Sequence, residues 1–112
     1  MKQRTKEYAK RVVKLCRTLP QSREGNLIGS QLFRSGTSVG ANYRAACRAR
    51  SKADFVSKLA IVLEEADETL YWLEIVTETG LVETGRIGNL MKEADEIISI
   101  IVASINTAKR SK

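Results

Sequence analysis

The chain has 112 residues and a formal net charge of +6, with 43% hydrophobic, 29% charged and 5% aromatic residues. This length suits a single domain, residues 1–112, and one Pro with seven Gly excludes a disordered or fibrous chain. The absence of histidine excludes Ser-His and Cys-His catalysis and di-iron sites built on Glu-x-x-His.

The first helix is predicted over residues 5–19, where apolar side chains recur at spacings of three and four. Lysines and arginines cover its other face, and Pro20 ends it. The second helix is predicted over 24–49, with Ser22 as its N-cap. Because the first helix is shorter than the others, one end of the molecule is expected to be less covered.

The middle of the second helix, residues 35–42, is unusually small and polar. It contains Gly36 and Gly40, and each glycine lowers helix stability by about 1 kcal/mol relative to alanine. We therefore expect a neighbouring helix to pack closely against this stretch. A short non-helical break near Gly36 is the alternative.

The third helix begins at a Ser-x-x-Asp capping box, residues 51–54, and is predicted to run to residue 79 before Gly80. Trp72 lies off its main apolar stripe, which indicates contact with a second neighbouring helix or another subunit. The fourth helix, predicted over 84–108, has the cleanest apolar periodicity in the chain.

These elements predict an all-α fold, an antiparallel up-down-up-down four-helix bundle with short connections. The charged first ten residues and the absence of an apolar run of about 18 residues argue against a leader and a membrane span. Cys16 and Cys47 are expected to be buried free thiols in a reducing cytoplasm.

Charge is divided unevenly along the chain. Residues 1–58 hold 14 Lys or Arg and 3 Asp or Glu, a net +11, whereas 59–112 hold 5 and 10, a net −5. This split suits a basic surface for RNA or DNA, or pairing of the two halves within or between chains. The candidate nucleic-acid-binding residues are Lys10, Lys14, Arg44, Arg48, Arg50 and Lys52.

The acidic run of the third helix supplies the competing partner for these arginines. Arg34 and Asp67 are expected to pair, which would fix the register of two helices. No catalytic residues, metal ligands or cofactor are expected, because no motif for them is present. The candidate residues for an interface between helices or subunits are Arg34, Glu64, Asp67, Glu68 and Trp72.

Three runs carry a resemblance: Q-L-x-R-S-x-x-S-V-x-x-N from Gln31, R-S-K-A-D-F from Arg50 and E-E-A-D-E-x-x-Y-W-L-E from Glu64. They resemble the four-helix bundle family first named from proteins encoded in intervening sequences of bacterial 23S ribosomal RNA genes. The resemblance implies a bacterial cytoplasmic protein, a left-handed bundle and a ring-shaped homo-pentamer. Where many members have Asn-Ile-Ala-Glu-Gly, residues 42–46 here read Asn-Tyr-Arg-Ala-Ala, which makes the surface more basic.

A more distant similarity is to the accessory protein of diversity-generating retroelements, a basic protein that binds a reverse transcriptase and nucleic acid. It implies RNA or DNA and a protein as partners. The expected function is that of a non-enzymatic oligomeric bundle that binds nucleic acid through the basic faces of its first two helices. A structural or protein-interaction bundle without nucleic-acid affinity is the alternative.

Overall fold

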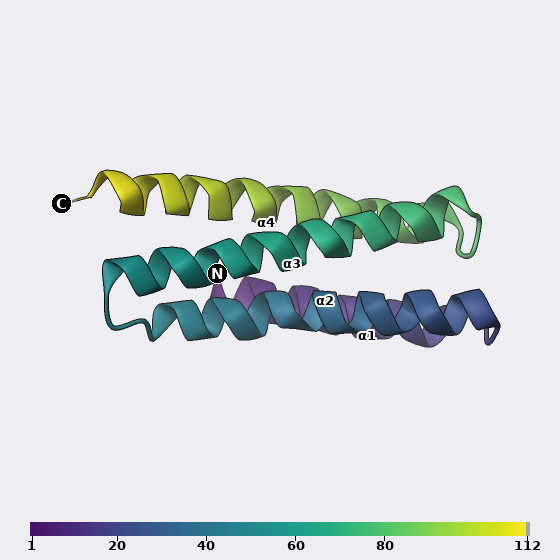
Figure 1. Cartoon of the computed structure of the whole chain (residues 1–112). Coiled ribbons are helices and arrows are strands. Elements are labelled where there is room, and N and C mark those ends of the chain that lie inside the picture. Colours follow the sequence, from purple (N-terminus) through teal and green to yellow (C-terminus); the bar gives the residue numbers. More distant parts are fainter. Residues whose placement is uncertain (112) are drawn as a thin grey trace.

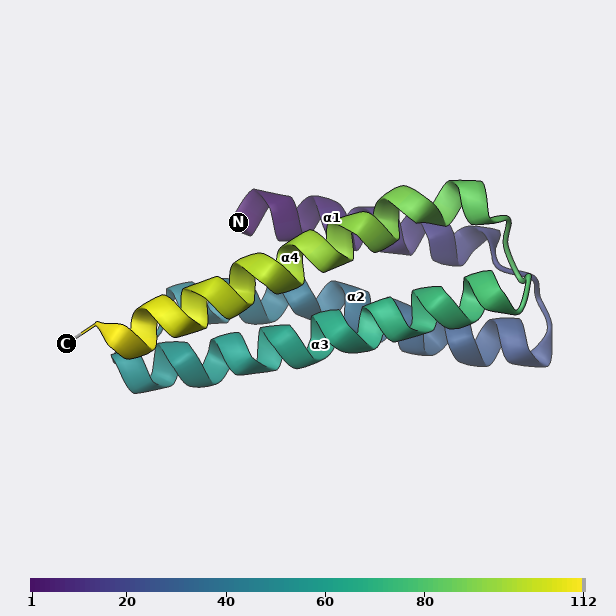
Figure 2. The same ribbon diagram turned by 90° about the horizontal axis from the view of Figure 1, so that it is seen from above.

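The computed structural model describes residues 1–111, with the backbone alone at Thr84 and Arg86, and Lys112 lies outside this range. Its helices are α1 (Lys2–Thr18), α2 (Arg23–Cys47), α3 (Lys52–Glu78) and α4 (Thr84–Arg110). Short loops join them at alternate ends of an elongated bundle measuring 50 × 20 × 19 Å (Figures 1 and 2). The predicted all-α four-helix bundle is confirmed, and its handedness stays a prediction.

Serine caps begin two of the helices as the sequence predicts. The Ser22 hydroxyl accepts a hydrogen bond from the Gly25 backbone N–H at 3.0 Å, and the Ser51 hydroxyl accepts one from the Asp54 N–H at 3.1 Å. Each cap satisfies a backbone donor that has no partner within its own helix. The corner between α2 and α3 is therefore fixed by local chemistry at the start of α3.

Gly80 ends α3 with a φ of +73°, in the left-handed region that glycine enters without a steric penalty. Its N–H donates to the Thr77 carbonyl at 3.2 Å, and the Leu81 N–H donates to the Val76 carbonyl at 3.1 Å. This pair of bonds is the Schellman arrangement, which satisfies two of the last carbonyls of a helix.

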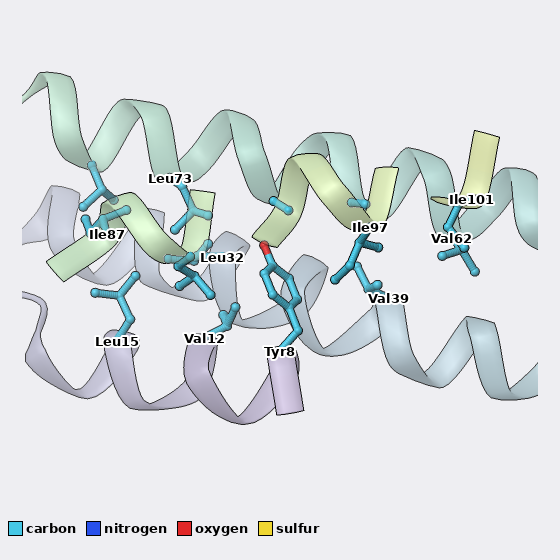
Figure 3. Packing of buried hydrophobic residues seen from close by; sticks show 14 of the residues in the cluster. Tyr8, Val12, Leu15, Leu32, Val39, Val62, Leu73, Ile87, Ile97 and Ile101 are labelled. Carbon is cyan, nitrogen blue, oxygen red and sulfur yellow. The ribbon is translucent and has the colours of Figure 1, made fainter. Parts of the chain in front are cut away.

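One apolar core runs along the bundle and receives side chains from all four helices (Figure 3). Helix α4 supplies the residues that its periodicity predicts, because positions three or four apart share one helix face. Its buried members among the described side chains are Ile87, Leu90, Ala94, Ile97 and Ile101. Tyr8, Val12 and Leu15 of α1 also enter this core.

Helices α1 and α2 pack closely at the glycines of α2. A Cβ atom at Gly36 would lie 2.6 Å from Cγ1 of Val12, and one at Gly40 would lie 3.2 Å from the Thr5 carbonyl oxygen. The expected close packing over 35–42 is confirmed. The alternative of a break near Gly36 is wrong, since α2 is continuous from Arg23 to Cys47.

The N-terminus of α1 lies part-way along the bundle, so the last turns of α2 extend beyond it (Figures 1 and 2). The expected less-covered end is therefore present. Tyr43 lies in this region and packs half-buried against the core.

Both cysteines are free, as expected, but only one is shielded from solvent. Cys16 is half-buried, its Sγ lies 3.6 Å from the Gly29 carbonyl oxygen, and burial raises the pKa of its thiol. Cys47 is exposed, so the prediction of its burial is wrong. It follows the buried Ala46 by one position, which turns its side chain about 100° away from the core.

None of the helices in the described part of the chain has the length and apolar character that a membrane crossing requires.

Candidate nucleic-acid interface

Four lysines form one exposed line along α1, because they recur every four residues opposite a buried face. Tyr8, Val12 and Leu15 hold that buried face against the core, which leaves the lysine line in solvent. At 1.5 Å per residue the line is about 18 Å long. Its members are Lys2, Lys6, Lys10 and Lys14.

The lysine line continues onto α2 through two adjoining depressions. The first, here called the cleft, has a volume of about 180 Å³ and lies between the start of α1 and the second half of α2. Its lining residues are Lys2, Lys6, Ala9, Thr37, Gly40, Ala41 and Arg44. The second is a groove of about 300 Å³ along α1, lined by Lys6, Ala9, Lys10, Val13, Lys14 and Arg17.

Lys6 and Ala9 belong to both depressions, so the two are continuous. Arg48 follows Arg44 by four residues on α2 and extends this surface beyond the cleft toward the α2–α3 corner. We call the whole surface the basic band. It consists of Lys2, Lys6, Lys10 and Lys14 on α1 with Arg44 and Arg48 on α2.

Arg48, Arg50 and Lys52 of the predicted site are exposed and lie at the α2–α3 corner, which extends beyond the N-terminus of α1 (Figure 1). Lys52 donates to the Ser111 carbonyl oxygen, which joins the corner to the end of α4. Within residues 1–111, Arg44, Arg48 and Arg50 form no ion pair. The Glu64–Glu68 run of the same chain therefore does not neutralise these three guanidinium groups.

That acidic run instead pairs with Arg34. Its guanidinium lies 3.3 Å from a Glu65 carboxylate oxygen and also pairs with Glu68, whose hydrogen bond is the largest cause of a raised pKa for Arg34. The expected Arg34–Asp67 pair is wrong. Glu65 and Glu68 share a helix face, whereas Asp67 is two residues from Glu65 and points to the exposed side of α3.

Arg4 was not singled out from the sequence, yet it makes the best-formed ion pair of the described chain. Its Nε and Nη2 atoms each donate to Glu93 at 2.7 Å, and Nη2 lies 3.4 Å from Glu96. The hydrogen bond from Arg4 lowers the pKa of Glu93. This bidentate pair joins α1 to α4.

Sequence reasoning also left Lys2 and Lys6 out of the site. Their four-residue spacing continues upstream from Lys10 and Lys14, and that repeat could have identified them. No comparable pattern relates Arg4 to Glu93, because 89 residues separate them.

Helix α3 presents a different surface, here called the outer α3 stripe. It combines acidic and apolar side chains at spacings of three and four, and Ile61 and Tyr71 are 40% and 54% exposed. Its members are Ile61, Glu64, Asp67 and Tyr71. Trp72 lies beside it, half-buried against the core, with its ring 5.0 Å from that of Tyr71.

Among the residues that the structure describes, no group of three His, Cys, Asp or Glu side chains is placed to hold a metal ion.

The model of the 23S rRNA-intervening sequence protein family matches residues 1–103 of the chain. The protein belongs to this family. A similar solved structure is a protein of unknown function from Bacteroides thetaiotaomicron, described as a member of the S23 ribosomal protein family. It is 38% identical, with a TM-score of 0.87, and the match covers 93% of this chain and 96% of that chain. No curated protein matches the chain.

Membership of the intervening sequence protein family confirms the resemblance carried by the three sequence runs. The match includes the whole of α1, α2 and α3 and most of α4. It therefore covers both the basic band and the outer α3 stripe.

Proposed function

We propose that this intervening sequence protein is a cytoplasmic, oligomeric module that binds the phosphate backbone of RNA or DNA through the basic band and the adjoining α2–α3 corner. One observation carries the proposal: within residues 1–111, Lys10 alone among the band residues has a carboxylate partner. That partner, Glu7, lies 3.2 Å away on the same helix, and both side chains are about half exposed. Such a pair contributes little.

Lysines that recur every four residues without carboxylate partners destabilise the helix on which they lie. Like charges four residues apart destabilise a helix by about 0.2–0.5 kcal/mol per pair. A bound polyanion relieves that repulsion and releases its own counterions, which makes binding strong at low salt. The band would follow successive phosphates over about 18 Å of α1.

Fluorescence anisotropy with a labelled single-stranded RNA at about 50 mM salt tests the proposal, because phosphate contacts are strong there. Arg44→Glu combined with Arg48→Glu should abolish binding. The matched control is Lys92→Glu with Lys109→Glu, which makes the same change in net charge at exposed sites on α4. Equal losses in both variants, or no binding by the unmodified protein, would reject the proposal.

The outer α3 stripe favours a second candidate function, assembly through protein contacts. Ile61 and Tyr71 are exposed next to Glu64 and Asp67, which have no ion pair with any described side chain. This combination suits a contact with another subunit, and the pentamer implied by resemblance is one such assembly. Under this proposal, Glu64→Lys with Asp67→Lys lowers the mass measured by light scattering, whereas reversing Lys10 and Lys14 leaves it unchanged.

Glu68 is unsuitable for that assembly test, because it pairs with Arg34 inside the chain. Its reversal would disturb the α2–α3 contact as well as any subunit interface. An unchanged mass for the Glu64 and Asp67 variant would remove the outer α3 stripe from the assembly.

A further inference from the structure

The cleft at the start of α1 differs from the rest of the basic band, because two helices enclose it. The α2 backbone approaches α1 closely at Gly40, where a Cβ would lie 3.2 Å from the Thr5 carbonyl oxygen. The small side chains of Ala9 and Ala41 leave the space above this contact open. The result is a hollow of about 180 Å³ with a floor made of backbone and methyl groups.

Three cations from two helices border this hollow. Lys2 and Lys6 stand one turn apart on α1, and Arg44 faces them from α2. None of the three forms an ion pair within residues 1–111. A guanidinium fork and two ammonium groups around one hollow match a tetrahedral oxyanion, which accepts hydrogen bonds from several sides.

The position of Lys2 is unfavourable for the stability of α1 alone. The first turn of a helix carries positive partial charge and is stabilised by acidic residues. Among the described residues, the first turn of α1 contains no acidic residue, and its N-cap makes no side-chain hydrogen bond. Both the helix dipole and the side chains therefore raise the positive potential at this end of the cleft.

We propose that the cleft seats a single phosphate group, held jointly by Lys2, Lys6 and Arg44. The inference rests on the proposed function, since the favoured source of the phosphate is the backbone of bound nucleic acid. The next phosphates of the strand then lie in the groove along α1, where they contact Lys10 and Lys14. In this arrangement the cleft fixes where the strand begins on the protein, and the exposed lysines add affinity without fixing its position.

Ala41→Glu tests the cleft directly, because position 41 is exposed, lines the hollow and tolerates a longer helix-forming residue. The new carboxylate would occupy the phosphate position. Ala103→Glu is the matched control, since Ala103 is an exposed alanine on α4. Losing a charge-assisted contact predicts about a tenfold or greater loss of RNA affinity for Ala41→Glu beyond that of Ala103→Glu. Circular dichroism checks that both variants fold.

A second experiment tests the cleft without nucleic acid, by NMR titration of the ¹⁵N-labelled protein with inorganic phosphate alone. The proposal predicts amide shift changes centred on Gly40 and Ala41 that Lys6→Gln weakens and Lys92→Gln leaves unchanged. Lys6→Gln should also reduce the steepness of the salt dependence of RNA binding by about 0.7, the contribution of one phosphate contact on a single strand.

The outcomes separate the two proposals. If the protein binds RNA but Ala41→Glu and Ala103→Glu lose equal affinity, the cleft proposal is wrong while the proposed function stands. If RNA does not bind, the proposed function fails. Phosphate shifts at Gly40 would then support the cleft with free phosphate as its source, and their absence would overturn it.

Discussion

Replacing Gly36 with alanine should destabilise the bundle, although alanine is the better helix former. The new Cβ would lie 2.6 and 2.9 Å from the two methyl carbons of Val12, which is wholly buried. Valine in a helix has one strongly preferred side-chain rotamer, so rotation does not relieve both contacts. Overpacking costs about 1–3 kcal/mol, and the gain in helix propensity returns about 1 kcal/mol. Because both methyl groups are too close, we expect a cost in the upper half of that range, and therefore a net loss of about 1–2 kcal/mol.

Gly88→Ala is the matched control. Gly88 lies in α4, is exposed, and a Cβ there meets no atom within 4 Å. The same substitution should therefore stabilise the bundle by about 0.5–1 kcal/mol. Urea unfolding followed by circular dichroism at one protein concentration measures both. With a slope of about 2 kcal/mol per molar urea, the midpoint falls by about 0.5–1 M for Gly36→Ala and rises for Gly88→Ala.

The double variant Val12→Ala with Gly36→Ala extends this test. Removing the two methyl groups of Val12 should reduce the additional loss caused by the new Cβ at position 36, which appears as a coupling energy of about 0.5–3 kcal/mol in a double-mutant cycle. If Gly36→Ala stabilises the protein as much as Gly88→Ala does, the close packing of α1 against α2 does not require glycine at position 36.

Three further substitutions test other parts of the structure. Tyr8→Phe should leave stability unchanged or raise it by up to about 1 kcal/mol in urea unfolding, because the buried hydroxyl has no hydrogen-bond partner among the described residues; a clear loss would show that it has one. Glu93→Gln should make the free energy of unfolding depend less steeply on pH in the acid range. Arg4 lowers the pKa of Glu93 below its ordinary value of 4.5, so at acid pH the unfolded chain binds more protons than the folded protein does. The stability that the Arg4–Glu93 pair contributes is therefore complete above pH 4.5 and is lost as the pH falls through the pKa of Glu93 in the folded protein. A profile as steep as that of the unmodified protein would contradict this. Ser51→Ala should lower thermal stability by about 1 kcal/mol through loss of the α3 cap, and an unchanged melting temperature would count against it.

The fold was predictable from sequence because its determinants are local. Apolar side chains at helical spacing define each buried face, and the serine caps and Gly80 mark helix boundaries to within three residues. The close packing at Gly36 was also predictable, since glycine in a helix interior needs a compensating contact. These features depend on residues that are neighbours in the chain.

The candidate site was only partly predictable, because its polar contacts join residues far apart in the chain. Periodicity places Arg34 near the acidic face of α3, but it does not select Glu65 and Glu68 over Asp67. The pair of Arg4 and Glu93 depends on how α1 lies across α4, which no local pattern encodes. The cleft likewise depends on the register between α1 and α2, which brings Lys2 opposite Arg44.

The salt dependence of RNA binding by the unmodified protein tests the central claim most directly. Fluorescence anisotropy titrations between about 50 and 200 mM salt give the slope of log K against log salt concentration. Six band cations on a single strand predict a slope near −4, at about 0.7 per phosphate contact. A slope near zero, or no binding at about 50 mM salt, would contradict the claim that the basic band binds nucleic acid.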